Sequence, residues 1–88
     1  MDLELNAETA QNIQERLARI EGQVRGISKM VAERRPCDQV LMQIMAARAA
    51  LEKVAAAVVS SSIDECLSLP PEEARKVIGR SISMLTQV

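Results

Sequence analysis

The longest stretch of this chain without a helix breaker runs from Pro36 to Cys66, and it constrains the fold more than any other feature. No glycine or further proline interrupts it, and many of its residues are alanine, which has the highest helix propensity. A helix of about 30 residues would be roughly 45 Å long. In a chain of 88 residues, such a helix cannot cover its apolar side with one neighbouring element. We therefore expect the chain to associate with copies of itself.

Prolines at two places divide the chain into three predicted helices. Asn6 is a candidate N-cap for the first helix, and Pro36 ends that helix because the residue before a proline avoids the α region. Pro70 and Pro71 begin a third helix. Since the chain has no Phe, Tyr or Trp and is rich in alanine, we predict an all-α fold. The predicted single domain covers residues 1–88, with helices at about 7–34, 37–66 and 71–87.

Apolar side chains in the first predicted helix recur at alternating spacings of four and three residues, the heptad pattern of packed helices. They are Ile13, Leu17, Ile20, Val24, Ile27 and Val31. The second helix adds a wide apolar face of its own. The simplest way to bury both is a homodimer with a four-helix-bundle core, built from the first two helices of each protomer. Gly22 and Gly26, four residues apart beside this row, indicate close approach of another backbone.

Charge and hydropathy argue against several classes of protein. The formal net charge of −1 is not that of a generally basic nucleic-acid-binding chain, so an anionic partner would have to meet a patterned face. No apolar run approaches the roughly 18 residues of a membrane span, and no secretory leader pattern is visible. We therefore expect a cytoplasmic protein with no membrane partner. The chain has no histidine and no recognisable phosphate loop, so we do not expect an enzyme.

The two cysteines lie at opposite ends of the predicted central helix. Cys37 and Cys66 fall on nearly the same helical face but roughly 43 Å apart, so they cannot meet within one chain. If this helix packs antiparallel to its copy, Cys37 of one protomer lies beside Cys66 of the other, and two-fold symmetry gives two such sites. Cys37 follows Arg34 and Arg35 and begins the predicted helix, surroundings that are typical of reactive cysteines. The sequence thus predicts an attacking thiol and a second thiol that resolves it.

Several uses of these thiols remain open on the residues alone. Both cysteines could be small apolar residues that fill a helical face. Two thiolates suit Cu(I), a soft ion that accepts low coordination, whereas zinc, nickel or cobalt would require carboxylates because histidine is absent. Two apposed thiols without a metal suit sulfur redox chemistry.

A polar flank of the first helix is a candidate anion-binding surface. Arg16, Arg19 and Gln23 lie within roughly 60° of one another on a helical wheel. The alternative is a solvated edge of the bundle in which Glu15 pairs with Arg19 at i,i+4.

Residues 16–55 read RLARIEGQVRGISKMVAERRPCDQVLMQIMAARAALEKVA, which resembles the CsoR/RcnR family of bacterial transcriptional repressors. With the later cysteine, the resemblance covers nearly the whole chain. It implies three-helix protomers in an antiparallel dimer, usually paired into a tetramer. It also implies binding of operator DNA and release when an inducer binds. Arg16 and Lys53 match basic positions that family members use for DNA, so we predict Arg16, Arg19, Gln23 and Lys53 as the DNA-binding residues.

The resemblance also bears on the inducer. In copper-sensing relatives, a cysteine at the start of the second helix joins a histidine and a cysteine from the partner's second helix. Here these positions carry Cys37, Ser62 and Cys66, and a serine hydroxyl is a poor ligand for Cu(I). Two cysteines without the histidine are similar to the CstR-like persulfide sensors. We therefore predict a sensor of persulfide or polysulfide, with no cofactor, that bridges Cys37 to the partner's Cys66; the alternative is a Cu(I)-responsive repressor using the same thiolates.

Overall fold

The molecule is an all-α protein, seen in a computed structural model that describes residues 5–66 and 69–86. Side chains are described over residues 5–61 and 69–84. The helices in these ranges are α1 (Ala7–Ala32), α2 (Cys37–Cys66) and α3 (Pro71–Thr86). No strand occurs among the described residues, and the predicted fold class is confirmed.

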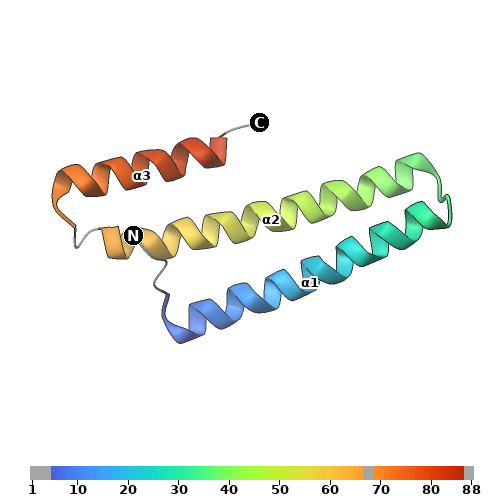
Figure 1. Ribbon diagram of the computed structural model, residues 1–88, viewed down its shortest axis with the longest axis horizontal. Coiled ribbons are helices and arrows are strands. Elements are labelled where there is room, and N and C mark those ends of the chain that lie inside the picture. The colour runs from blue at the N-terminus through green and yellow to red at the C-terminus, as the bar shows by residue number, and fades with distance from the viewer. Residues whose placement is uncertain (1–4, 67–68, 87–88) are drawn as a thin grey trace.

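The helices form a single flat layer. α2 lies in the middle, α1 packs along one of its sides and α3 along the other (Figure 1). The molecule measures 53 × 29 × 14 Å, and a helix with its side chains is about 10–12 Å across. The layer is therefore one helix thick, and none of the described helices forms a further layer on its two broad faces.

α1 begins and ends with well-defined caps. The Asn6 side chain accepts a hydrogen bond of 2.7 Å from the backbone N–H of Thr9, which satisfies one of the free donors at the helix start. At the other end, the Arg34 N–H donates to the Val31 carbonyl at 3.1 Å and the Arg35 N–H to the Met30 carbonyl at 3.0 Å. These two bonds form a Schellman motif.

This motif ends α1 at Ala32, two residues before the predicted end near residue 34. The Schellman turn requires a left-handed residue, and Arg34 supplies it with a φ of 54°. Glycine normally occupies such a position because it has no Cβ to clash. The third helix begins at Pro71, and residue 87, its predicted last residue, lies outside the described residues.

We expect Arg34→Gly to raise the free energy of unfolding by about 0.5–1 kcal/mol, because glycine relieves the left-handed strain at this turn. Thermal denaturation at fixed protein concentration measures the effect. Arg35→Gly is the matched control, since Arg35 does not have a positive φ, and it should lower stability instead. Equal shifts in both variants would contradict the explanation.

The protomer encloses a very small core. Among the described side chains, the buried apolar residues are Ile13, Ile20, Ala47 and Val54. The predicted heptad row of α1 is split by the packing on α2. Ile13 and Ile20 are 7% and 6% exposed, whereas Leu17, Val24 and Val31 are 41%, 53% and 60% exposed.

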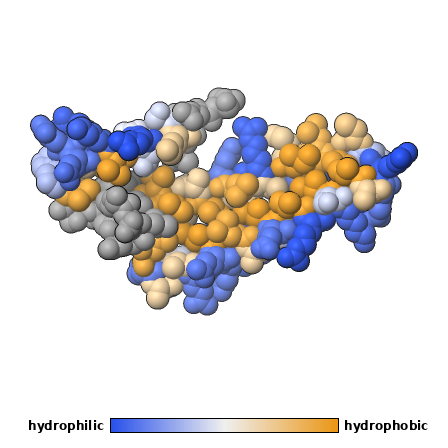
Figure 2. Space-filling view, in the orientation of Figure 1, coloured by the Kyte–Doolittle hydropathy of each residue, from blue (hydrophilic) through white to orange (hydrophobic). Residues whose placement is uncertain are grey.

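The uncovered apolar side chains form a band along the molecule (Figure 2). The exposed apolar residues of α2 include Leu41, Ile44, Met45 and Leu51, all between 44% and 54% exposed. An apolar surface that extends over two helices is typical of a protein–protein interface. A Cβ added at Gly22 or Gly26 meets no atom within 4 Å, so the close backbone approach predicted there does not occur within the protomer.

None of the helices, over the part of the chain described, combines the length and apolarity that a membrane crossing needs.

Candidate functional site

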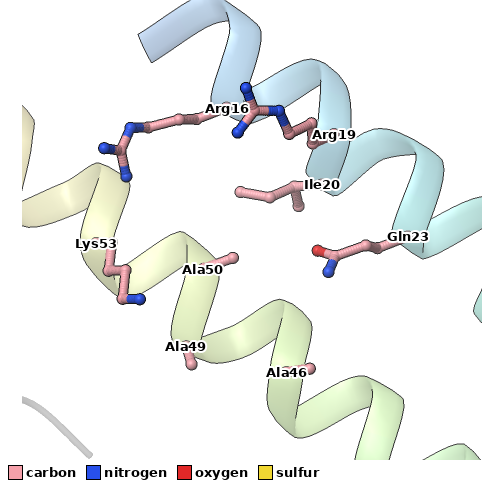
Figure 3. Close-up of a pocket in the computed structure, with 8 residues that line it drawn as sticks. All are labelled: Arg16, Arg19, Ile20, Gln23, Ala46, Ala49, Ala50 and Lys53. Atoms are coloured by element: carbon pink, nitrogen blue, oxygen red, sulfur yellow. The ribbon is translucent and has the colours of Figure 1, made fainter. Parts of the chain in front are cut away.

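The predicted DNA-binding residues meet in one groove between α1 and α2. Figure 3 shows Arg16, Arg19 and Gln23 on α1 and Lys53 on α2 around a common space. The groove has a volume of about 410 Å³. Its remaining lining residues are Ile20, Ala46, Ala49 and Ala50. We call it the basic groove.

Short side chains open the basic groove. Ile20 is buried against α2, which fixes the α1 flank over α2. The alanines at positions 46, 49 and 50 present only methyl groups to the space between the helices. Bulkier residues there would fill part of the volume that Arg16, Arg19 and Lys53 also line.

The basic groove carries three cations and no carboxylate. Arg16 donates through Nε to the Asn12 Oδ1 at 2.9 Å, a neutral partner that orients the guanidinium without cancelling its charge. Within the described residues, Arg16, Arg19 and Lys53 form no ion pair. Glu15, the alternative partner of Arg19, instead accepts a hydrogen bond from Gln11 at 3.3 Å. The groove is therefore suited to an anion, and a duplex phosphate backbone fits its charge.

The candidate sensing thiols occupy the two ends of α2. Cys37 is the first residue of α2 and is an exposed free thiol. It lines a second groove of about 290 Å³. The other lining residues are Val31, Arg34, Arg35, Val40, Leu41 and Ile44. Cys66 is the last residue of α2, so the two cysteines are far apart in one protomer, as the sequence predicts.

Other predictions at this end of α2 fall outside the described side chains. They concern Ser62 and Cys66, and the meeting of Cys37 with the partner's Cys66 stays a prediction. Over the side chains that are described, no cluster of three or more histidine, cysteine or acidic residues is placed to hold a metal ion.

Sequence reasoning did not single out every residue of these two grooves. It did not single out the alanines that open the basic groove, although they lie three, four and seven residues before Lys53, a spacing that places them on the same helical face. The apolar wall around Cys37 includes Val40, Leu41 and Ile44, which follow Cys37 at three, four and seven residues. That spacing is the signal for a shared helical face.

Known proteins with similar sequences and folds are transcriptional regulators. Residues 9–88 match the family described as "Metal-sensitive transcriptional repressor". The copper-sensing transcriptional repressor RicR of Mycobacterium tuberculosis is 42% identical over 57 residues, which cover 65% of this chain and 59% of RicR. The copper-sensing transcriptional repressor CsoR of Bacillus subtilis is 45% identical over 56 residues, or 64% of this chain and 55% of CsoR.

A solved structure extends this likeness to almost the whole fold. The nickel-responsive transcriptional regulator InrS superposes with a TM-score of 0.64 at 35% identity, over 97% of this chain and 89% of InrS. By contrast, the matched segments span less than two-thirds of RicR and of CsoR. The resemblance to CsoR/RcnR repressors inferred from residues 16–55 is confirmed, and the family is one of repressors and not of enzymes. The chain belongs to the family of metal-sensitive transcriptional repressors.

Proposed function

We propose that this protein is an operator-binding repressor that releases DNA when reactive sulfur bridges Cys37 to the partner's Cys66. One observation carries the DNA-binding half of the proposal. The basic groove gathers Arg16, Arg19 and Lys53 from two helices without a carboxylate in its lining. The sensing half is supported by two thiols at opposite ends of α2 in a chain that has no histidine.

Symmetry multiplies the modest charge of one basic groove. A homodimer presents two copies and a homotetramer four, enough cations to neutralise several phosphates at once. None of the described helices stands out from the flat layer as a recognition helix would. Affinity would then come mainly from backbone contacts, and sequence preference from the shape and deformability of the duplex.

The sensing step needs only thiol exchange. The Cys37 thiolate attacks the terminal sulfur of an organic persulfide RSSH; the S–S bond breaks, RS⁻ leaves, and Cys37 carries an Sγ–SH group. The thiolate of the partner's Cys66 then attacks Sγ of Cys37, and hydrosulfide leaves as the disulfide closes. Two thiolates are oxidised and one sulfane sulfur is reduced. If the partner's Cys66 is itself persulfidated, the same attack closes a trisulfide.

Copper is the second candidate inducer, because RicR and CsoR are copper-sensing. Cys37 and the partner's Cys66 would hold Cu(I) as two thiolates, a donor set that suits a soft ion. Serine stands at position 62, so this chain lacks the imidazole that the resemblance places there in copper sensors. A histidine-rich nickel set does not fit, since the chain contains no histidine.

A DNA-binding titration separates these inducers. A duplex selected from a random library by the reduced protein is titrated anaerobically with the protein alone, with polysulfide and with Cu(I). We expect polysulfide to weaken binding at least tenfold and Cu(I) to have a smaller effect. Release of the DNA by Cu(I) but not by polysulfide would identify copper as the inducer in place of reactive sulfur. Failure to select any duplex would contradict the repressor proposal itself.

A further inference from the structure

A charged pair interrupts the exposed apolar row of α2. The row follows heptad spacing and consists of Cys37, Leu41, Ile44, Arg48, Leu51 and Ala55. Its leucine and isoleucine members are 44–54% exposed. Arg48 is the one charged member, and its Nε lies 3.4 Å from the Glu52 Oε1 in the next turn. These side chains are 57% and 68% exposed in the protomer.

The bridge of the proposed function requires that α2 packs antiparallel to α2 of the partner. This packing places Arg48 and Glu52 near the two-fold axis. When Cys37 lies opposite the partner's Cys66, the two-fold axis crosses α2 midway between the cysteines, between Leu51 and Glu52. Along the axis of the helix pair, the four charged residues then follow one another in the order Arg48, the partner's Glu52, Glu52 and the partner's Arg48. At about 1.5 Å per residue, Arg48 is roughly 6 Å in level from its own Glu52 and roughly 4.5 Å from the partner's Glu52. Along the helix axis, each guanidinium therefore lies close to two carboxylates, one from each subunit.

We propose that Arg48 and Glu52 of two copies of this chain form a four-charge cluster on the symmetry axis that fixes the register of the α2 pair. The inference rests on the antiparallel dimer of the proposed function. We infer that a second copy of the chain covers the apolar band of α2, because a two-fold rotation places Arg48 of each copy near Glu52 of the other.

The apolar row alone would leave the register poorly defined. A slide of one heptad, about 10 Å along the axis, still places leucine and isoleucine against apolar side chains. The same slide would carry Cys37 away from the partner's Cys66. In one direction it brings the two Arg48 guanidinium groups to the same level, and in the other it moves Arg48 roughly 15 Å along the axis from the partner's Glu52. A polar residue at a single position of an apolar seam is an established means of setting register. Arg48 and Glu52 thus determine whether the two thiols meet.

Mixing two charge-reversed variants tests the cluster. Arg48→Glu gives a subunit with two carboxylates at these positions, and Glu52→Arg gives one with two guanidinium groups. Each variant alone should raise the dimer dissociation constant at least tenfold, about 1.4 kcal/mol, through like-charge repulsion. An equimolar mixture should form a heterodimer within about threefold of the wild-type affinity. Both subunits keep repulsive pairs within their own helices, so only contacts between subunits can restore binding.

The measurements are native mass spectrometry of full-length, reduced protein with one variant tagged, and the yield of Cys37–Cys66 cross-linking by a short bismaleimide. Cross-linking should fall in each variant and return in the mixture. Arg25→Glu and Glu21→Arg are the matched controls, since this i,i+4 pair on α1 lies at 3.1 Å with side chains 78% and 66% exposed; neither should alter dimer affinity by more than about twofold.

Two results would overturn the register cluster: variants at Arg48 and Glu52 that dimerise like wild type, or a mixture no tighter than either variant alone. Because the reduced protein is measured without DNA or an inducer, these results are independent of the sensing chemistry. Restored pairing together with no response to polysulfide would leave the cluster intact and remove the proposed inducer.

Discussion

Replacing Arg16 with alanine should weaken binding to the selected duplex by about tenfold to a hundredfold at low salt. The side chain lines the basic groove, and a symmetric dimer loses two copies of it at once. Each lost phosphate contact removes about 0.9 from the slope of log affinity against log salt. The slope should therefore become shallower by about two units for a dimer, while the preference among sequences changes little.

Fluorescence anisotropy at several salt concentrations measures both quantities. Arg25→Ala is the matched control, because Arg25 is a cation of the same helix that pairs with Glu21 and does not line the basic groove. Its affinity should stay within about twofold of wild type. Equal losses in the two variants would indicate a general electrostatic effect, and an unchanged salt slope for Arg16→Ala would remove Arg16 from the DNA contact.

Filling the basic groove should have a related effect without changing its charge. Ala49→Leu adds a branched side chain to the lining and would reduce the volume of the groove that Arg16 and Lys53 also line. We expect DNA affinity to fall by about tenfold, because the cations can no longer approach the same phosphates. Circular dichroism should show unchanged helix content. Wild-type affinity in this variant would show that the groove between the helices is not the contact surface.

The sequence predicts the helices well but does not show which neighbour each apolar row meets. The apolar row on α1 is regular from Ile13 to Val31, yet only alternate members of the row pack on α2. Ile13 and Ile20 face that neighbour, whereas Leu17 and Val24 face outward. Periodicity identifies the apolar face of a helix. How that face is divided among neighbours depends on the crossing of the helices and on the second copy, neither of which is local to the sequence.

The basic groove shows a similar limit. Helical spacing on α1 is sufficient to group Arg16, Arg19 and Gln23, but Lys53 lies on another helix and was assigned only through family resemblance. Its position follows from the turn between the helices. That turn depends on a left-handed Arg34, which the sequence does not signal because glycine is the usual residue there. Pro36 marks the boundary, and the hydrogen-bonded turn decides how the helices align.

Replacing Cys37 with serine should abolish the response to polysulfide while leaving DNA affinity within about twofold of wild type. Serine has no thiolate to attack a sulfane sulfur. Cys37 also lies outside the basic groove, on a helix level roughly 24 Å from Lys53. Cys66→Ser should abolish release by a different route, because Cys37 gains sulfur but no thiol from the partner closes the bridge. Intact-mass spectrometry distinguishes the two, since the added sulfur stays only on the Cys66→Ser protein.

Mixing these two inactive variants gives the sharpest test of the sensing geometry. A heterodimer of Cys37→Ser and Cys66→Ser subunits holds one complete pair of thiols only if each pair is contributed by two subunits. Polysulfide should then produce a covalent dimer on a non-reducing gel from the mixture and from neither variant alone. A thiol pair within one chain could not be rebuilt by mixing. Because α2 separates its own two cysteines by its full length, we expect the covalent dimer; a mixture that stays monomeric on the gel would rule out the bridge between subunits.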